Sequence, residues 1–366
     1  MDPVTHFMTG ACLARTGFNR RTAYATLVMT LAAEAPDLDT LWGLRGPIAS
    51  FQHHRGWTHT FLGLPLDALV VTGAVYLWHR WRTRGARGTR AADRPTPIGA
   101  TGNASPPARW PLLFGLALLA LLSHLLLDWT NNYGLRPFFP FNPRWYAGSF
   151  VFIVEPVMLL LLAVGLAAPA LFGLISSEVG ASRDRFRGRG WATFALIGIA
   201  ILYAVRGYER LHAEDLARAA DYGGAPVLRS TVSPYPINPF RWYGVVETPN
   251  FFQTSAINSL SDQVATTSQE DLFFKPPETA ATLAAKRSHL GRAYLDWSSF
   301  PIVTQTAADP AAAVPGATTA VTFRDLRYLY DTVGLHGRET PPLSGEVLLD
   351  AHNEVLQQSM DGKPAH

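Results

Sequence analysis

The chain has little cysteine and little charge, and these two shortages bound its class. Cys12 is the only cysteine among 366 residues, so no disulfide can form within the chain. Charged residues make up 16% of the sequence, compared with roughly 25% in ordinary globular proteins. The net charge is only +3, and no basic array carries interleaved aromatics, so nucleic acid is not expected as a partner.

Several familiar signatures are also missing. Neither a P-loop nor a Gly-x-Ser-x-Gly pattern occurs, so nucleotide-driven and serine-hydrolase chemistry have no support. No cleavable signal peptide is visible, because the residues before Cys12 carry no positive segment and are too few for an apolar one. A membrane protein with internal spans needs no such signal.

What the chain does have is long apolar runs, confined to residues 1–208. Four of them reach the roughly 20 residues that a bilayer-spanning helix needs. They cover residues 61–81, 110–129, 151–175 and 191–208. Two shorter stretches, 4–14 and 22–35, are expected to form a hairpin against the bundle. We therefore expect an all-α polytopic membrane helix bundle of four long spans plus a short N-terminal hairpin.

Arginine placement predicts the orientation of this bundle. Arginines cluster between the first two long spans, between the last two, and in the turn of the early hairpin. By the positive-inside rule these three loops are cytoplasmic. Residues 36–60, 130–150 and everything after 208 then face outward across a bacterial inner membrane. The segment 83–107, rich in Gly, Pro, Ala, Thr and Arg, is expected to be a disordered linker.

Residues 209–366 are expected to form a smaller, soluble, mostly β extracytoplasmic domain after the transmembrane metal-site domain of residues 1–208. A short helix is expected over 209–222. Strand-like β-branched and aromatic content marks four segments, and an Ala- and Pro-rich loop is expected over 307–319. The four segments are 227–232, 241–248, 320–323 and 346–349.

Polar side chains of metal-binding type collect at the outer face predicted by this topology. His124 and Asp128 lie four residues apart, and so share one face of a helix near its outer end. Ionisable groups in a membrane helix are costly and usually mark a functional interior. The candidates are His6, Asp37, Asp39, His54, Arg55, His59, His124 and Asp128. For the helical pair alone, a buried hydrogen bond that locks two helices is an equally good interpretation.

Mixed His and Asp ligation suits zinc, and also manganese or iron. Five to seven candidate ligands are more than one four-coordinate ion needs, and they favour a site with two or three ions. Such ions together activate a water molecule and hold the attacking and leaving oxygens of an in-line displacement. Glu155 also falls in this outer layer. Arg55 could be an anion clamp or an interface residue, and Asp37 is the best candidate for a general base.

An ordered set of motifs then resembles a known family, the bacterial membrane-bound metal-dependent hydrolases. The motifs are Met1-Asp-Pro-Val-Thr-His6, Pro36-Asp-Leu-Asp39, His54-Arg-Gly-Trp-Thr-His59 and Ser123-His-Leu-Leu-Leu-Asp128. The resemblance covers roughly residues 1–206, and the family in turn is distantly similar to the zinc-dependent phospholipase C and P1 nuclease group.

This resemblance implies ligand roles for five residues, and less firmly for Asp37 and His54. The five are His6, Asp39, His59, His124 and Asp128. The chain departs from the family where an aspartate is often found, at Gly148-Ser149, and where aspartate is common in place of Glu155. If the missing aspartate is a ligand, the cluster here is one ion short.

Three functions compete on this sequence. The first is a hydrolase acting at the outer leaflet on a phosphoester of a lipid or envelope component. The second is a non-catalytic membrane protein whose metal is structural or sensory. A transporter is the weakest, since among charged residues only Asp67 lies deep in a span. Substrate, metal identity and oligomeric state are left open.

Overall fold

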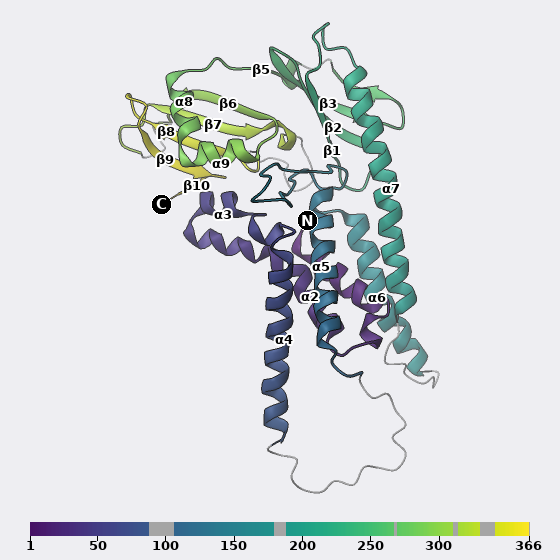
Figure 1. Ribbon diagram of the computed structural model, residues 1–366. Coiled ribbons are helices and arrows are strands. Elements are labelled where there is room, and N and C mark those ends of the chain that lie inside the picture. The colour runs from purple at the N-terminus through teal and green to yellow at the C-terminus, as the bar shows by residue number, and fades with distance from the viewer. Residues whose placement is uncertain (88–105, 179–187, 267–268, 310–313, 330–340, 366) are drawn as a thin grey trace, which may run out of the picture.

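Helices build the first half of the protein, and two β-sheets build most of the second. The computed structural model describes residues 1–87, 106–178, 188–266, 269–309, 314–329 and 341–365. The long helices run side by side, and the sheets lie across one end of them (Figure 1). The helical elements of the first half are α1 (Pro3–Arg15), η1 (Phe18–Arg20), α2 (Ala25–Glu34), η2 (Ala35–Arg45), α3 (Pro47–His53), η3 (Trp57–His59), α4 (Leu64–Arg87), α5 (Trp110–Thr130), α6 (Pro156–Glu178) and α7 (Arg189–Ala219).

The two short apolar stretches near the start of the chain form the expected hairpin, α1 and α2. Asp2 caps α1 by accepting a hydrogen bond from the backbone N–H of Thr5. Gly10 allows the two helices to approach closely, because a Cβ at this position would lie 2.6 Å from the carbonyl oxygen of Met29.

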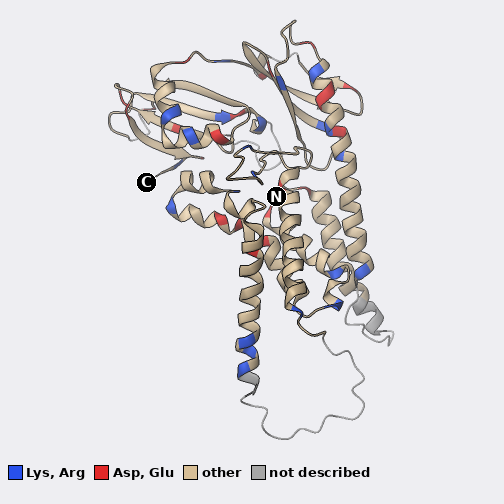
Figure 2. Cartoon of the chain, in the orientation of Figure 1, with Lys and Arg blue, Asp and Glu red and all other residues tan. Residues whose placement is uncertain are grey.

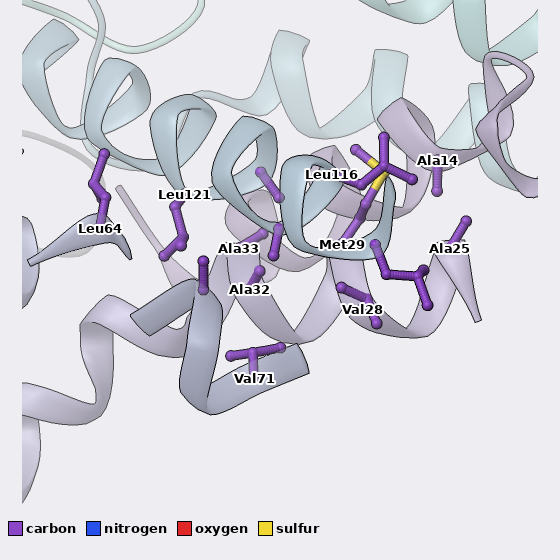
Figure 3. Packing of buried hydrophobic residues seen from close by; sticks show 14 of the residues in the cluster. Ala14, Ala25, Val28, Met29, Ala32, Ala33, Leu64, Val71, Leu116 and Leu121 are labelled. Atoms are coloured by element: carbon purple, nitrogen blue, oxygen red, sulfur yellow. The ribbon is translucent and has the colours of Figure 1, made fainter. Parts of the chain in front are cut away.

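An apolar core joins α2 to α4 and α5. Figure 3 shows Val28 and Met29 of α2 close to Leu116 of α5, with Leu121 and Val71 in the same cluster. All five side chains are buried. This packing holds α2 against α5, so η2, which follows α2 directly, begins beside the C-terminal part of α5.

Two helices are long and apolar enough to cross a membrane, α5 and α7, among the residues that the structure describes. A third span results if the segment Pro47–His59 and the first part of α4 are counted together, although they meet at an angle of 85°. In α6 the described apolar part, Pro156–Phe172, is shorter. α4 runs to Arg87, so the first residues of the expected linker are helical, whereas residues 88–105 lie outside the described chain.

The second half is rich in β-structure, as expected, and is arranged in two antiparallel sheets. The first has the order β1-β2-β3-β4 with β5 beside β3, and the second the order β10-β9-β8-β7-β6. The strands are β1 (Arg229–Pro234), β2 (Arg241–Glu247), β3 (Phe251–Asn258), β4 (Gln263–Val264), β5 (Leu272–Phe274), β6 (Pro301–Ala307), β7 (Thr319–Asp325), β8 (Gly345–Leu349), β9 (Val355–Met360) and β10 (Lys363–Pro364). Helices α8 (Ala280–Arg287) and α9 (His289–Trp297) precede β6.

The four expected strands correspond to β1, β2, β7 and β8, but β3, β6 and β9 were missed. Each of the three contains polar residues that blur the apolar alternation, such as Gln253 and Thr254 in β3. These two side chains are nevertheless buried. β3 lies inside its sheet, between β2 on one side and β4 and β5 on the other. The expected short helix after residue 208 is the continuation of α7.

The sheets are packed onto one end of the helical bundle, not merely connected to it through α7. Ile48 and Phe51 of α3 share an apolar cluster with Leu290 and Trp297 of α9. The indole N–H of Trp297 also donates to the backbone carbonyl of Tyr133, at 3.2 Å. The segment that carries the candidate site is therefore held between the helices and the second sheet.

Candidate metal centre

Four side chains from three separate elements converge at the C-terminal end of α5. They are Asp37 from η2, His59 from η3, and His124 and Asp128 from α5, and one ligand atom of each lies within 4.8 Å of the others. His124 and Asp128 share a face because they are one helical turn apart. The side chains of both histidines and of Asp128 are at most 1% exposed, whereas that of Asp37 is 18% exposed.

Hydrogen bonds set the orientation of His124. Its Nδ1 atom lies 2.7 Å from the backbone carbonyl oxygen of Ala33 at the end of α2. A carbonyl oxygen can only accept, so Nδ1 carries the proton and donates it. The Nε2 atom of His124 therefore presents a lone pair to the cluster.

The same argument applies to His59. Its Nδ1 atom lies 3.1 Å from the Thr58 hydroxyl oxygen and 3.3 Å from Oδ2 of Asp39. The hydroxyl of Thr58 donates to the carbonyl of Pro36 at 2.9 Å, so its oxygen is left to accept from His59. Nδ1 of His59 thus carries a proton, and in the neutral ring its Nε2 atom also presents a lone pair to the cluster.

With these tautomers the Nε2 lone pairs of His59 and His124 face each other. The distances around them show whether a metal ion fits between the side chains. The two Nε2 atoms lie 3.1 Å apart. Oδ2 of Asp128 lies 3.3 Å from Nε2 of His59 and 3.5 Å from that of His124, yet no described group donates a hydrogen bond to it. Two nitrogen and two carboxylate donors around one point repel one another unless a metal ion, or a proton on one imidazole, lies between them. The donor set fits a divalent ion of the zinc, manganese or iron type.

Asp39 lies behind His59 instead of among the four. Its Oδ2 accepts from the backbone N–H of Arg55 at 2.6 Å, and its Oδ1 lies 3.1 Å from Nδ1 of His54. Burial alone would raise the pKa of Asp39, but the hydrogen bonds with His54 and His59 hold it well below its usual range. Carboxylates in this position commonly fix the orientation of a ligating histidine.

Asp37 has similar electrostatics at the more open side of the group. Burial alone would raise the pKa of its carboxyl, whereas the interactions with His59 and His124 lower it to about 2. Its Oδ1 lies 3.5 Å from Nε2 of His59 and 3.7 Å from Nε2 of His124. The sequence predicts a base role for Asp37 and, less firmly, a ligand role, and the geometry brings its carboxylate into the candidate ligand set.

Arg55 is tied to the cluster and to the loop after α5. Its guanidinium donates to Oδ1 of Asp128 at 2.8 Å, and to Asn131 Oδ1 and the Gly134 carbonyl at 3.2 and 2.7 Å. The ring of Tyr133 lies 4.8 Å from the guanidinium carbon. Nε of Arg55 is buried and has no acceptor among the described groups.

The remaining histidines of the motifs lie at different distances from the group. His6 stacks on His124 with ring centroids 3.8 Å apart, and its Nε2 atom lies 3.3 Å from Oδ1 of Asp128. The terminal amine of Met1 contacts the same carboxylate oxygen. His53 stacks on Trp42 instead, with centroids 4.1 Å apart, and takes no part in the cluster.

Glu155, expected in the same outer layer, has a different role. Its carboxylate forms a buried ion pair with Arg206 of α7 at 2.8 Å and accepts from the backbone N–H of Ile237 at 3.1 Å. It therefore ties α6 to α7 and to the first sheet. Nothing in the local sequence marks Arg206 as its partner, because the two residues are far apart in the chain.

A cavity of about 660 Å³ lies beside the cluster, between the helical part and the second sheet. His54 and Arg55 line it on the helical side, and Tyr328 and Met360 line it on the sheet side. The same Arg55 contacts Asp128, so the cavity and the candidate metal centre share a wall.

Comparison with known proteins places this arrangement in a family. Over 164 residues the chain is 25% identical to the protein named "Uncharacterized protein YfhP" of Bacillus subtilis (strain 168). That alignment covers 43% of this chain and 42% of the relative, so the chain matches less than half the length of this relative. No solved structure matches. Residues 1–213, which include the whole cluster, match the family described as YdjM inner membrane protein, and the chain belongs to this family.

Proposed function

We propose that the protein is a membrane-embedded, metal-dependent hydrolase that acts at the outer face of the membrane on a phosphoester of a lipid or envelope component. The observation that carries the proposal is the convergence of two histidine lone pairs and two carboxylates at the end of an apolar helix. A cavity adjoins this point through Arg55, which lines the cavity and also contacts Asp128.

In this proposal Asp37, His59, His124 and Asp128 hold the metal. Asp39, Thr58 and the Ala33 carbonyl orient the two histidines. A bound divalent ion, zinc first and manganese as the alternative, would supply a Lewis acid and an acidified water for hydrolysis. Asp37 acts as a ligand here, in place of the base role suggested by the sequence.

A second or third ion remains part of the proposal and would draw on other residues. Nε2 of His6 lies 3.3 Å from Oδ1 of Asp128, the oxygen that Arg55 also contacts. His54 shares Asp39 with the backbone N–H of Arg55. Both histidines are close enough to the four-residue group for a neighbouring ion, and their loss is expected to lower metal stoichiometry before it abolishes binding.

Arg55 is proposed to keep Asp128 ionised and in place, and to meet the anionic part of a substrate. Its charge compensates that of Asp128, since the two side chains form a buried pair at 2.8 Å. A buried carboxylate without a partner would be strongly unfavourable.

We further propose four membrane spans, with the metal centre and the sheets outside the cytoplasm. The basis is the distribution of charge: basic residues gather at the end of the bundle opposite the sheets, including the lower end of α4 in Figure 2. Basic residues flanking spans favour the cytoplasmic side.

The depth of the site follows from an apolar ridge on η2. Leu38, Leu41 and Leu44 are 62%, 61% and 88% exposed. Side chains three residues apart line up along a 3-10 helix, so the three leucines form one ridge. We propose that this ridge lies in the outer leaflet, which places Asp37 at the level of lipid headgroups.

Reporter fusions test the topology. Fusions after residues 90 and 186 are expected to report cytoplasm, and a fusion after residue 230 is expected to report the extracytoplasmic side, because of the arginine distribution. A cytoplasmic signal at residue 230 would put the metal centre on the inner face and contradict the proposed orientation.

A hydrolysis assay tests the catalytic part of the proposal. The full chain in detergent with zinc or manganese is expected to cleave bis-para-nitrophenyl phosphate, and Asp37→Asn is expected to lower the rate by at least about 100-fold, since even outer-shell changes cost metal sites 10–100-fold. His53→Ala, outside the cluster, is the control and should keep the rate. An equal rate in Asp37→Asn would assign the activity to a contaminant.

One observation favours a second function, a structural or sensory metal site. Structural sites are closed, whereas catalytic sites keep an open position, and three of the four candidate ligands are almost fully buried. Under this alternative the protein binds metal stoichiometrically but turns over no phosphoester. The exposed edge of Asp37 and the adjoining cavity favour the enzyme.

A further inference from the structure

Two residues that line the cavity beside the metal centre each carry a buried donor atom with no acceptor among the described groups. One is Nε of Arg55 on the helical side, and the other is the hydroxyl of Tyr328 on the sheet side. Buried donors are nearly always paired, and leaving one unpaired costs about 1–3 kcal/mol. Burial raises the pKa of Tyr328, so its hydroxyl stays protonated and can donate. Two donors from different parts of the chain thus await an acceptor.

The rest of the lining is mostly apolar. Phe51, Phe152, Leu343 and Met360 contribute side chains from α3, from the loop before α6 and from the sheet region. The one carboxylate in the lining, Asp361, accepts a hydrogen bond from the backbone N–H of Ser344 at 3.0 Å. Water filling such a space would leave this apolar surface hydrated, which is unfavourable.

The size and position of the cavity limit its occupant. Its volume of about 660 Å³ lies within the 300–1,000 Å³ range of small-molecule sites. It sits where the helices end, next to the proposed headgroup level. Arg55 lines the cavity and also binds Asp128, so an acceptor held by Arg55 lies next to the metal centre.

We propose that this cavity binds a membrane lipid with an anionic headgroup, whose oxygen is held by Arg55 and Tyr328 and whose alkyl chain lies against Phe51, Phe152, Leu343 and Met360. The inference deepens the proposed function by naming the substrate class of the same site. It differs from a site for free phosphate, because inorganic phosphate would satisfy the two donors but leave the apolar wall exposed to water.

Photo-crosslinking tests the proposal without requiring turnover. The full chain in nanodiscs would be labelled with a phosphatidylglycerol that carries a photoactivatable group in its acyl chain, and the labelled residues would be mapped by mass spectrometry. Labels are expected at Phe51, Phe152 or Met360. Labels found only on the lipid-facing sides of the long helices would overturn the proposal.

Two variants and a matched control sharpen the test. Leu343→Trp fills the apolar part and is expected to lower cavity labelling about 10-fold, a loss equivalent to about 1.4 kcal/mol. Tyr328→Phe removes one donor and is expected to weaken binding about 5–10-fold, the worth of one hydrogen bond. Tyr208→Phe changes a tyrosine that is 69% exposed on α7 and should bind like the unaltered chain. Unchanged metal content in all three would show that the fold is intact.

The outcomes separate this inference from the proposed hydrolase. Labelling of the cavity without any phosphoester turnover would keep the lipid site and reject the enzyme. Turnover of a soluble phosphodiester with equal labelling of Leu343→Trp and the unaltered chain would keep the enzyme and reject the lipid site. Complete displacement of the probe by millimolar inorganic phosphate would also reject it, in favour of a simple anion site.

Discussion

Replacing His124 with alanine is expected to strip the purified protein of most of its metal. His124 supplies one of the two nitrogen donors, and its Nε2 atom is fixed toward the cluster by the bond from Nδ1 to Ala33. Losing one of four ligand bonds leaves a site that competes poorly with buffer and water. The affinity for the metal is expected to fall by at least about 100-fold, more than the loss caused by changes outside the ligand set. Elemental analysis of protein purified after growth in metal-replete medium would detect this as a loss of most of the metal per chain.

Matched variants distinguish ligands from residues that orient them. His53→Ala should retain full metal content, because His53 stacks on Trp42 away from the cluster. Asp39→Asn should bind metal about 10–100-fold more weakly but still bind it, as expected for a residue that only orients His59. Full metal content in both His124→Ala and Asp128→Ala would mean that this pair is a buried hydrogen bond and that any metal lies elsewhere.

The second large expected effect is a loss of stability when the contact between the sheet region and the loop after α5 is broken. Arg327→Met is expected to destabilise the protein by about 3–5 kcal/mol, the usual result of removing one partner of a buried ion pair. Arg327 donates to both carboxylate oxygens of Asp325, at 2.9 and 2.8 Å, and to the backbone carbonyl of Asn132 at 2.6 Å. The substitution leaves that carboxylate buried and unpaired. The free energy of unfolding in mixed micelles would measure the loss.

An exposed ion pair between the loop after α5 and the sheet region provides the control. Arg136 and Asp296 lie 2.8 Å apart, but the side chain of Asp296 is 48% exposed. Asp296→Ala is therefore expected to cost less than about 1 kcal/mol, as is usual for exposed pairs. Equal losses in the two variants would mean that the buried contact of Arg327 does not hold the sheet region to the loop after α5.

Local spacing predicted part of the site well. His124 and Asp128 could be paired from sequence because a helix places residues i and i+4 on one face. The hairpin of α1 and α2 followed from two short apolar stretches. The different tasks of Asp37 and Asp39 could not be foreseen, because they depend on which of two nearby carboxylates the 3-10 turn of η2 directs inward.

Other features depend on contacts between distant segments. The Ala33 carbonyl that orients His124 carries no side-chain signal at all. Glu155 was grouped with the metal motifs because it falls in the same layer, and only the packing of α7 supplies its partner Arg206. Likewise β3 carries buried polar residues, so its apolar alternation was too weak to identify. Tyr328, on the sheet side of the cavity, lies outside every motif.

X-ray absorption spectroscopy of the metal in the purified full chain would test the central claim most directly. The ion is expected to show two imidazole nitrogens and carboxylate oxygens at about 2.0–2.2 Å, and the imidazole signal is expected to fall by half in His59→Ala wherever metal remains. A protein that carries no metal after growth in metal-replete medium would contradict the account, as would an ion without imidazole ligands. The cluster of His59, His124 and Asp128 would then be a buried hydrogen-bonded network whose histidines hold protons instead of a metal.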